Sequence, residues 1–198
     1  MASDATEMDW RWHTRDFIVA AAIAVPLGVF LSYVYSFIWT AASGAVPPLG
    51  DFLDGFYVVG GVLVGYIVRK PGSALLGSLL SALIELPLTG FGAVVLWLGL
   101  LQGLGVEALF LGVRYRHFGW GVMMLAGAAG ALLSVVGYYY PVEGWAQLEP
   151  GVQVLRIVLK LLGGAVLAGV LGKLIGDALA ATGVLNNFPI AKARTREI

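Results

Sequence analysis

The sequence predicts an all-α, polytopic membrane protein, folded as a bundle of six transmembrane helices. Its 198 residues are 59% hydrophobic and only 12% charged, and the mean hydropathy is +0.87. Long apolar runs alternate with short clusters of charge, which is typical of helical membrane proteins. The alternation of a membrane β-barrel, in segments of about 10 residues, is not found. The length suits one domain.

Six apolar segments carry this prediction. The expected spans are Phe17–Trp39, Phe52–Val68, Ser73–Leu86, Phe91–Val113, Trp120–Tyr138 and Val152–Thr182. The third has about 14 residues, roughly 21 Å of helix against a hydrocarbon core of about 30 Å, which predicts little tilt or a local break. The sixth is long, and its ends are expected to leave the membrane.

Basic residues occur in every second loop. The basic segments carry Arg11, Arg15, Arg69, Lys70, Arg114, Arg116, Lys192, Arg194 and Arg196, and the other loops carry Asp51, Asp54, Glu143 and Glu149. Because basic loops stay on the cytoplasmic side, both termini are expected in the cytoplasm. The protein itself is expected in the plasma (inner) membrane. The predicted organisation is a cytoplasmic segment 1–16, a six-helix membrane domain 17–186 and a basic cytoplasmic tail 187–198. No small-residue cleavage site follows the first run, so an uncleaved span is expected.

Several function classes lack their sequence signatures. The formal net charge is +0, so no basic face for nucleic acid is expected. No cysteine is present, His13 and His117 lie in loops, and no paired metal-ligand spacing or hydrolase motif occurs, so no metal or cofactor is expected. The segment 169–173 ends in Gly-Lys but lacks the first glycine and the Ser/Thr of a phosphate-binding loop. The chain is therefore predicted not to be an enzyme or ATPase.

Polar side chains within the apolar runs mark the candidate site, because such groups are costly in lipid and face the protein interior. Glu85 is either solvated at the outer interface or pairs with a cationic or amidine-like ligand. Gln102, roughly 16 Å deep, needs a neighbouring helix or a ligand as partner. Glu107 is expected to form a structural pair with Lys or Arg. Arg156 and Lys160 pair with either of these acids or extend to the interface.

Aromatic residues add to this candidate site. Trp97, about 9 Å below the outer interface, either packs or stacks on a flat ring or cation. An aromatic belt at the outer interface includes Tyr57, and the consecutive tyrosines 138–140 exceed what a belt needs and could roof a pocket. Aromatic walls with one or two carboxylates suit a small, flat, positively charged heteroaromatic ligand. The candidate substrate-binding residues are Glu85, Trp97, Gln102, Tyr57, Tyr138 and Tyr139.

Small residues recur at four-residue steps in the first and last spans. The two stripes are Ala20, Ala24 and Gly28, and Gly164, Ala168, Gly172 and Gly176. Positions four apart share a helix face, and small residues let helix backbones approach closely in lipid. Each stripe therefore indicates either close packing within the fold or a docking face for another membrane protein.

Four segments resemble the YkoE-type substrate-binding subunits, which are S components of energy-coupling factor (ECF) transporters associated with thiamin and its hydroxymethylpyrimidine precursor. The segments are Val68–Leu75, Leu101–Ala108, Gly164–Lys173 and Thr182–Asn186, and the likeness extends from about Asp51 to Asn186. The N-terminal segment and the loop Pro141–Gly151 take no visible part.

The resemblance implies a six-helix protein that binds a vitamin from outside, without ATPase activity of its own. It implies a membrane-embedded coupling (T) protein and two cytoplasmic ATPases, or a fused ATPase, as partners. Ala20, Ala24 and Gly28 match the small-residue pattern through which S components contact the coupling protein, so docking is expected there. The alternatives are an S component for another heteroaromatic vitamin, a structural or assembly membrane protein, and an intramembrane enzyme.

Overall fold

The computed structural model describes residues 10–186 and 188–194, so Arg196 of the predicted basic tail lies outside the described residues. Every regular element within these ranges is helical. The α-helices are α1 (Thr14–Phe30), α2 (Ser36–Ala45), α3 (Pro47–Asp54), α4 (Val59–Val68), α5 (Ser73–Leu88), α6 (Val94–Gly112), α7 (Trp120–Ser134), α8 (Pro150–Gly163), α9 (Leu171–Ala181) and α10 (Pro189–Arg194). Short 3-10 or π segments are η1 (Leu31–Tyr35), η2 (Gly55–Val58), η3 (Val135–Tyr139), η4 (Trp145–Gln147) and η5 (Gly164–Val170).

Several of these elements join into continuous helices that are long and apolar enough to cross a membrane. These stretches are Thr14–Ala45, Pro47–Val68, Val94–Gly112, Trp120–Tyr139 and Pro150–Ala181. The shorter apolar helix α5, with 16 residues, matches the short third span expected from the sequence. The structure therefore confirms an all-α, multi-pass membrane fold with the expected order of apolar segments.

The first two spans differ from the sequence prediction at the turn between them. The first helix continues to Ala45 rather than ending near Trp39, and the second starts at Pro47 rather than Phe52. Val46 between them is extended, with φ −143° and ψ 92°. Proline disfavours helical backbone angles in the residue before it, here Val46, whereas proline itself suits the first position of a helix. The two prolines at 47 and 48 thus set this boundary.

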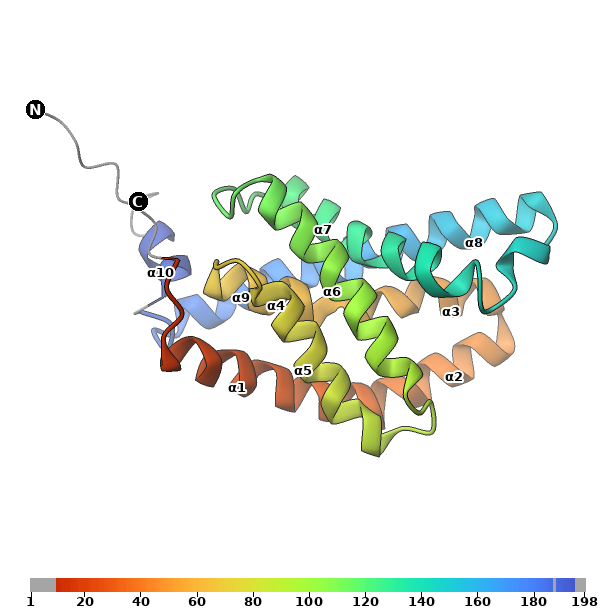
Figure 1. The fold of residues 1–198 in the computed structure, drawn as a ribbon, viewed down its shortest axis with the longest axis horizontal. Coiled ribbons are helices and arrows are strands. Elements are labelled where there is room, and N and C mark those ends of the chain that lie inside the picture. Colours follow the sequence, from red (N-terminus) through yellow and green to blue (C-terminus); the bar gives the residue numbers. More distant parts are fainter. Residues whose placement is uncertain (1–9, 187, 195–198) are drawn as a thin grey trace, which may run out of the picture.

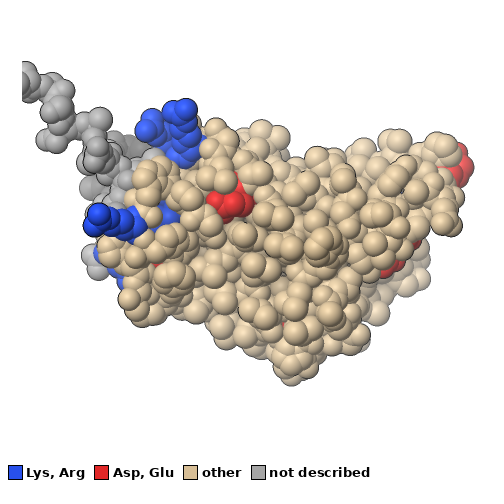
Figure 2. Space-filling model, viewed as in Figure 1, with Lys and Arg blue, Asp and Glu red and all other residues tan. Residues whose placement is uncertain are grey.

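The bundle has two distinct ends (Figure 1). The first described residues, α10, the 69–72 loop and the 113–119 loop meet at one end, which we call the basic end. The α2–α3 turn, the α5–α6 loop and the η3–α8 connection meet at the opposite end, which we call the cavity end. Figure 2 shows Lys and Arg side chains gathered at the basic end, with a largely uncharged surface between the ends. This arrangement agrees with the alternation of basic and acidic loops.

Helix α4 is the central helix of the bundle. All of its residues are buried, and it packs against α1, α5, α6 and α9. A helix that is apolar on every face needs such surroundings. Gly60 and Gly61 allow close approach to α5, because a Cβ at Gly60 would lie 2.7 Å from Ser81 Oγ. The glycine-rich sequence of this segment therefore serves close helix packing.

The small-residue stripe of α1 faces the protein interior, which corrects the expectation of a docking face. Ala20 and Ala24 are fully buried, and α1 packs on α5 and α4. A Cβ at Gly28 would lie 2.7 Å from the Cβ of Ile84 on α5. Spacing alone could not separate the two roles, because internal and external helix contacts both need small side chains.

The stripe in the last span also packs internally, as one of its two interpretations predicted. Ala168 is fully buried, and a Cβ at Gly164 would lie 2.9 Å from the Cβ of Ala131 on α7. A Cβ at Gly176 would lie 2.6 Å from the ring of Tyr66 on α4. This stripe therefore brings η5 and α9 against the central helix and α7.

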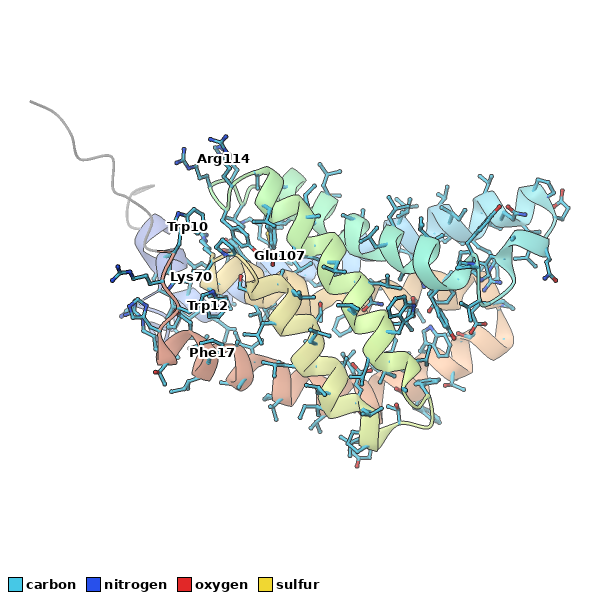
Figure 3. All side chains as sticks on the ribbon, viewed as in Figure 1. Trp10, Trp12, Phe17, Lys70, Glu107 and Arg114 are labelled. Carbon is cyan, nitrogen blue, oxygen red and sulfur yellow. The ribbon has the colours of Figure 1, made fainter. Side chains whose placement is uncertain are left out.

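Glu107 was expected to pair with Lys or Arg, and that prediction is wrong. Its carboxylate, on α6, accepts hydrogen bonds from the backbone N–H groups of Gly72 (2.7 Å) and Ala74 (3.1 Å), and from the Tyr115 hydroxyl (2.7 Å). Figure 3 shows Glu107 inside the bundle near the basic end. The first N–H groups of a helix lack intrahelical partners and favour a negative charge. The carboxylate therefore caps the start of α5.

Candidate functional site

A mostly apolar cavity of about 350 Å³ lies at the cavity end. Its walls come from α2, α3, η2, α5, the α5–α6 loop, α6, η3, η4 and α8. Aromatic rings form much of the lining: Trp39, Tyr57, Phe91, Tyr138, Tyr139 and Trp145. This volume falls in the range of small-molecule sites, which are concave and largely apolar with few placed polar groups.

The structure brings together most of the site residues predicted from the sequence. Glu85 on α5, Gln102 on α6, Tyr57 in η2, and Tyr138 and Tyr139 in η3 all line this cavity. They come from four separate segments of the chain. The candidate site is therefore a product of the helix packing and not of one local motif.

Trp97 is the exception, since the structure does not place it at the cavity. Its side chain is 48% exposed and lies in an open apolar groove with Leu83 and Leu100. Its indole N–H donates to the carbonyl oxygen of Gly137 at 3.2 Å. Gln102 lines the cavity, and Trp97 precedes it by five residues on α6. Five residues separate two side-chain directions by a net angle of about 140° around the helix axis, so Trp97 faces outward. This placement does not fit its expected role as a ligand contact.

One wall of the cavity is an ionic lattice between α3 and α8 that the sequence analysis missed. Arg156 donates two hydrogen bonds to Asp51, at 2.6 and 2.9 Å. Lys160 pairs with Asp54, which also accepts a hydrogen bond of 3.1 Å from the Tyr139 hydroxyl. The sequence analysis had instead offered Glu85 or Glu107 as partners of the two bases.

A spacing signal for this lattice exists in the sequence. The acids are three residues apart and the bases are four apart, so each pair shares one helix face. The acids were assigned to a loop because the start of α3 at Pro47 was not recognised. Once the residues from Pro47 onward are known to be helical, the matched spacing predicts two parallel ion pairs.

Aromatic rings cover the bases of this lattice. The guanidinium carbon of Arg156 lies 4.4 Å from the centroid of a Trp145 ring, and Lys160 Nζ lies 3.4 Å from the centroid of the Tyr139 ring. Trp145 is itself buried, at 2% exposure. Cations held over aromatic faces are stabilised, more so when water is excluded. The charges of this wall are thus already satisfied by the protein.

The opposite wall, from α5 and α6, keeps its hydrogen-bonding groups unused. Glu85 and Gln102 are 6% and 4% exposed, and neither side chain has a polar partner among the described residues. Ser78 Oγ is buried and also lacks a hydrogen-bond partner within the described chain. Buried polar groups are normally hydrogen-bonded, so three unpaired groups on one cavity wall point to a ligand.

The charge of the lining favours a cation or a strong hydrogen-bond donor. The cavity is lined by the acids Asp51, Asp54, Glu85 and Glu143 but by only two bases, Arg156 and Lys160. Glu143 accepts a hydrogen bond of 2.6 Å from the Tyr138 hydroxyl. Glu85 is then the acid whose carboxylate is left for a ligand. No group of three or more His, Asp or Glu side chains that could hold a metal ion occurs in the described ranges.

Comparisons with known proteins agree with this architecture. Residues 15–133 match the family model described as the permease component of an ABC-type cobalt transport system. The chain is 33% identical over 183 residues, 91% of each chain, to a protein of Bacillus subtilis (strain 168) named HMP/thiamine permease protein YkoE. A crystal structure of an S component of an ECF transporter superposes with a TM-score of 0.89 at 32% identity. That match covers 94% of this chain and 95% of the other.

These matches each cover more than nine tenths of the chain, a larger share than the stretch from Asp51 to Asn186 that carried the sequence resemblance. The similarity extends over almost the entire chain and joins sequence identity above 30% with a common fold. The chain therefore belongs to the YkoE-type family of membrane proteins, the S components of ECF transporters.

Proposed function

We propose that this S component captures thiamin or its hydroxymethylpyrimidine precursor in the cavity between the α3–α8 lattice and the α5–α6 wall. The observation that carries the proposal is the set of unpaired groups, Glu85, Gln102 and Ser78, that line the same cavity as the aromatic rings. A flat ring can stack on the aromatic residues while its amino group and ring nitrogens use the unpaired groups. The name of the relative from Bacillus subtilis supports the choice of vitamin.

The direct test is calorimetry on the purified chain in detergent, without ATP. Thiamin or hydroxymethylpyrimidine should bind with micromolar or tighter affinity, because binding to an S component needs no energy source. Riboflavin and biotin serve as matched vitamins of other shape and charge. Binding of one of these in place of the pyrimidine compounds would identify an S component for a different vitamin. Failure of a folded protein to bind any of them would refute the proposal.

Import itself needs partner proteins. In the proposed assembly, the chain associates with a membrane-embedded coupling (T) protein and with two cytoplasmic ATPases, or one fused ATPase. The sequence supports this division of labour, because its only Gly-Lys segment, 169–173, lies within η5 and α9 and lacks the remaining residues of a phosphate-binding loop. ATP hydrolysis would then belong to the partners.

The cavity is proposed to open toward the outside, with both termini in the cytoplasm. Its support is the position of the basic loops at the opposite end of the bundle. Single cysteines test this orientation cleanly, because the native chain has none. In intact cells, Gln147→Cys at the cavity end should react with a membrane-impermeant thiol reagent. His117→Cys at the basic end should react only after the membrane is permeabilised, and the reverse pattern would overturn the orientation.

A further inference from the structure

The 113–119 loop, which joins α6 to α7 at the basic end, has an unusual backbone. Arg114 and Tyr115 are consecutive non-glycine residues with φ of 52° and 53°. The left-handed region costs an L-residue roughly 1–2 kcal/mol, and such residues persist only where surrounding contacts fix them. The loop therefore holds a conformation that its own sequence does not favour.

Turn hydrogen bonds within the loop and the side-chain contacts of Tyr115 fix this conformation. The Tyr115 side chain is 1% exposed, and its hydroxyl donates to Glu107 at 2.7 Å. Its ring lies beside those of Phe110 and Phe118, with centroids 5.6 and 6.2 Å away. Burial, together with the neighbouring Glu107 carboxylate, raises the pKa of Tyr115, so the phenol remains a hydrogen-bond donor. The tyrosine anchors the loop to the cap of α5.

The result of this anchor is a rigid loop with two exposed arginines. Arg114 and Arg116 flank the buried tyrosine, and both side chains are exposed. Neither side chain has a hydrogen bond, ion pair or ring contact with any part of the chain that the structure describes. Figure 3 shows Arg114 pointing away from the bundle, in contrast to Glu107.

The surroundings of these arginines place them at the boundary of the apolar surface. Arg114 follows the end of α6 by two residues, and α7 begins at Trp120. Leu111 and Trp120 are 47% and 49% exposed, and both belong to helices long and apolar enough to cross a membrane. Tryptophan and arginine at the end of a membrane helix lie at the level of the lipid headgroups.

We propose that Arg114 and Arg116 bind the phosphate headgroup of an anionic phospholipid, whose acyl chains lie along the exposed apolar surface of α6 and α7. Guanidinium groups bind phosphate through paired hydrogen bonds, and a loop already held in place loses little further freedom on binding. Attraction to anionic lipid does not depend on the vitamin, so this site is separate from the proposed function. The lipid is favoured over an acidic protein surface because the arginines adjoin the exposed Leu111 and Trp120.

The test compares binding of dioleoylphosphatidylglycerol and dioleoylphosphatidylcholine to the purified full chain by native mass spectrometry. The wild type should prefer the anionic lipid. Arg114→Gln/Arg116→Gln should weaken binding of that lipid by roughly 30-fold, about fivefold for each arginine, and leave phosphatidylcholine unchanged. Arg11→Gln/Arg15→Gln removes the same charge from the same end and should have a much smaller effect. Circular dichroism checks that every variant is folded.

Several results would overturn the proposal. One is equal binding of the two lipids by the wild type, and another is an undiminished lipid preference in the Arg114/Arg116 variant. An equal loss in the Arg11/Arg15 variant would show that only net charge matters. Displacement of the lipid by inorganic phosphate at the same concentration would indicate a site for soluble anions. If the Arg114/Arg116 variant keeps its lipid but loses a co-purifying membrane subunit, the loop docks a protein.

Discussion

Replacing Lys160 by methionine is expected to lower the free energy of unfolding by about 3–5 kcal/mol. Lys160 is 1% exposed, pairs with the buried Asp54 and lies over the Tyr139 ring. Methionine retains most of the side-chain volume, so the loss comes mainly from leaving Asp54 buried without its cation. An isolated buried charge costs far more than a pair contributes, which makes this the largest stability effect expected in the molecule.

A double variant separates the loss of the pair from the loss of packing. Asp54→Leu/Lys160→Met removes both charges and should recover most of the stability, because no buried charge remains. Arg15→Met serves as the control, since its side chain is 55% exposed and lies 3.9 Å from Asp16, so its loss should cost about 1 kcal/mol or less. Unfolding in mixed micelles measures all of these variants. A double variant as unstable as Lys160→Met would contradict this account of the lattice.

Replacing Glu85 by glutamine is expected to weaken binding of the vitamin by roughly 10- to 150-fold. The substitution keeps the shape of the side chain but removes its charge. A hydrogen bond from a cationic or amidine-like edge of the ligand to a carboxylate contributes about 1.5–3 kcal/mol. Because Glu85 is buried and has no polar partner among the described residues, the ligand is the group that would supply this bond.

The matched control for this prediction is Glu143→Gln. Glu143 also lines the cavity, but it is exposed and accepts a hydrogen bond from Tyr138. We therefore expect less than a threefold change in affinity, because an exposed interaction contributes at most a fraction of a kcal/mol. Calorimetry on both variants, with thermal unfolding to confirm that they are folded, gives the comparison. An unchanged affinity in Glu85→Gln would assign this residue a structural role.

Much of the fold is predictable from the sequence, because a helix that crosses lipid must be apolar over its length and basic loops mark one side of the membrane. The boundary at Val46 was missed by several residues, since the apolar run hides a turn that only the prolines reveal. The two small-residue stripes show a different limit. Both have the spacing for close helix contact, and only the packed structure shows that Ala24 contacts its own protein and not a partner.

The candidate site was partly predictable for a related reason. Glu85 and Gln102 stand out in apolar surroundings, and the structure places both in the cavity. The partners of Glu107 could not be inferred, because they are backbone N–H groups that any sequence possesses. Trp97 was assigned to the site from its position along the helix, but it lies in an open groove outside the cavity, since position along a helix does not determine which way a residue points.

The central claim, that this cavity holds thiamin or hydroxymethylpyrimidine, is tested most directly by competition. The purified wild type is offered an equimolar mixture of thiamin, hydroxymethylpyrimidine, riboflavin and biotin, and native mass spectrometry records which one remains bound. The account predicts a single bound molecule with the mass of thiamin or hydroxymethylpyrimidine, and little or none in Glu85→Gln. Retention of riboflavin or biotin, or equal retention of the pyrimidine compound by folded wild type and Glu85→Gln, would contradict it.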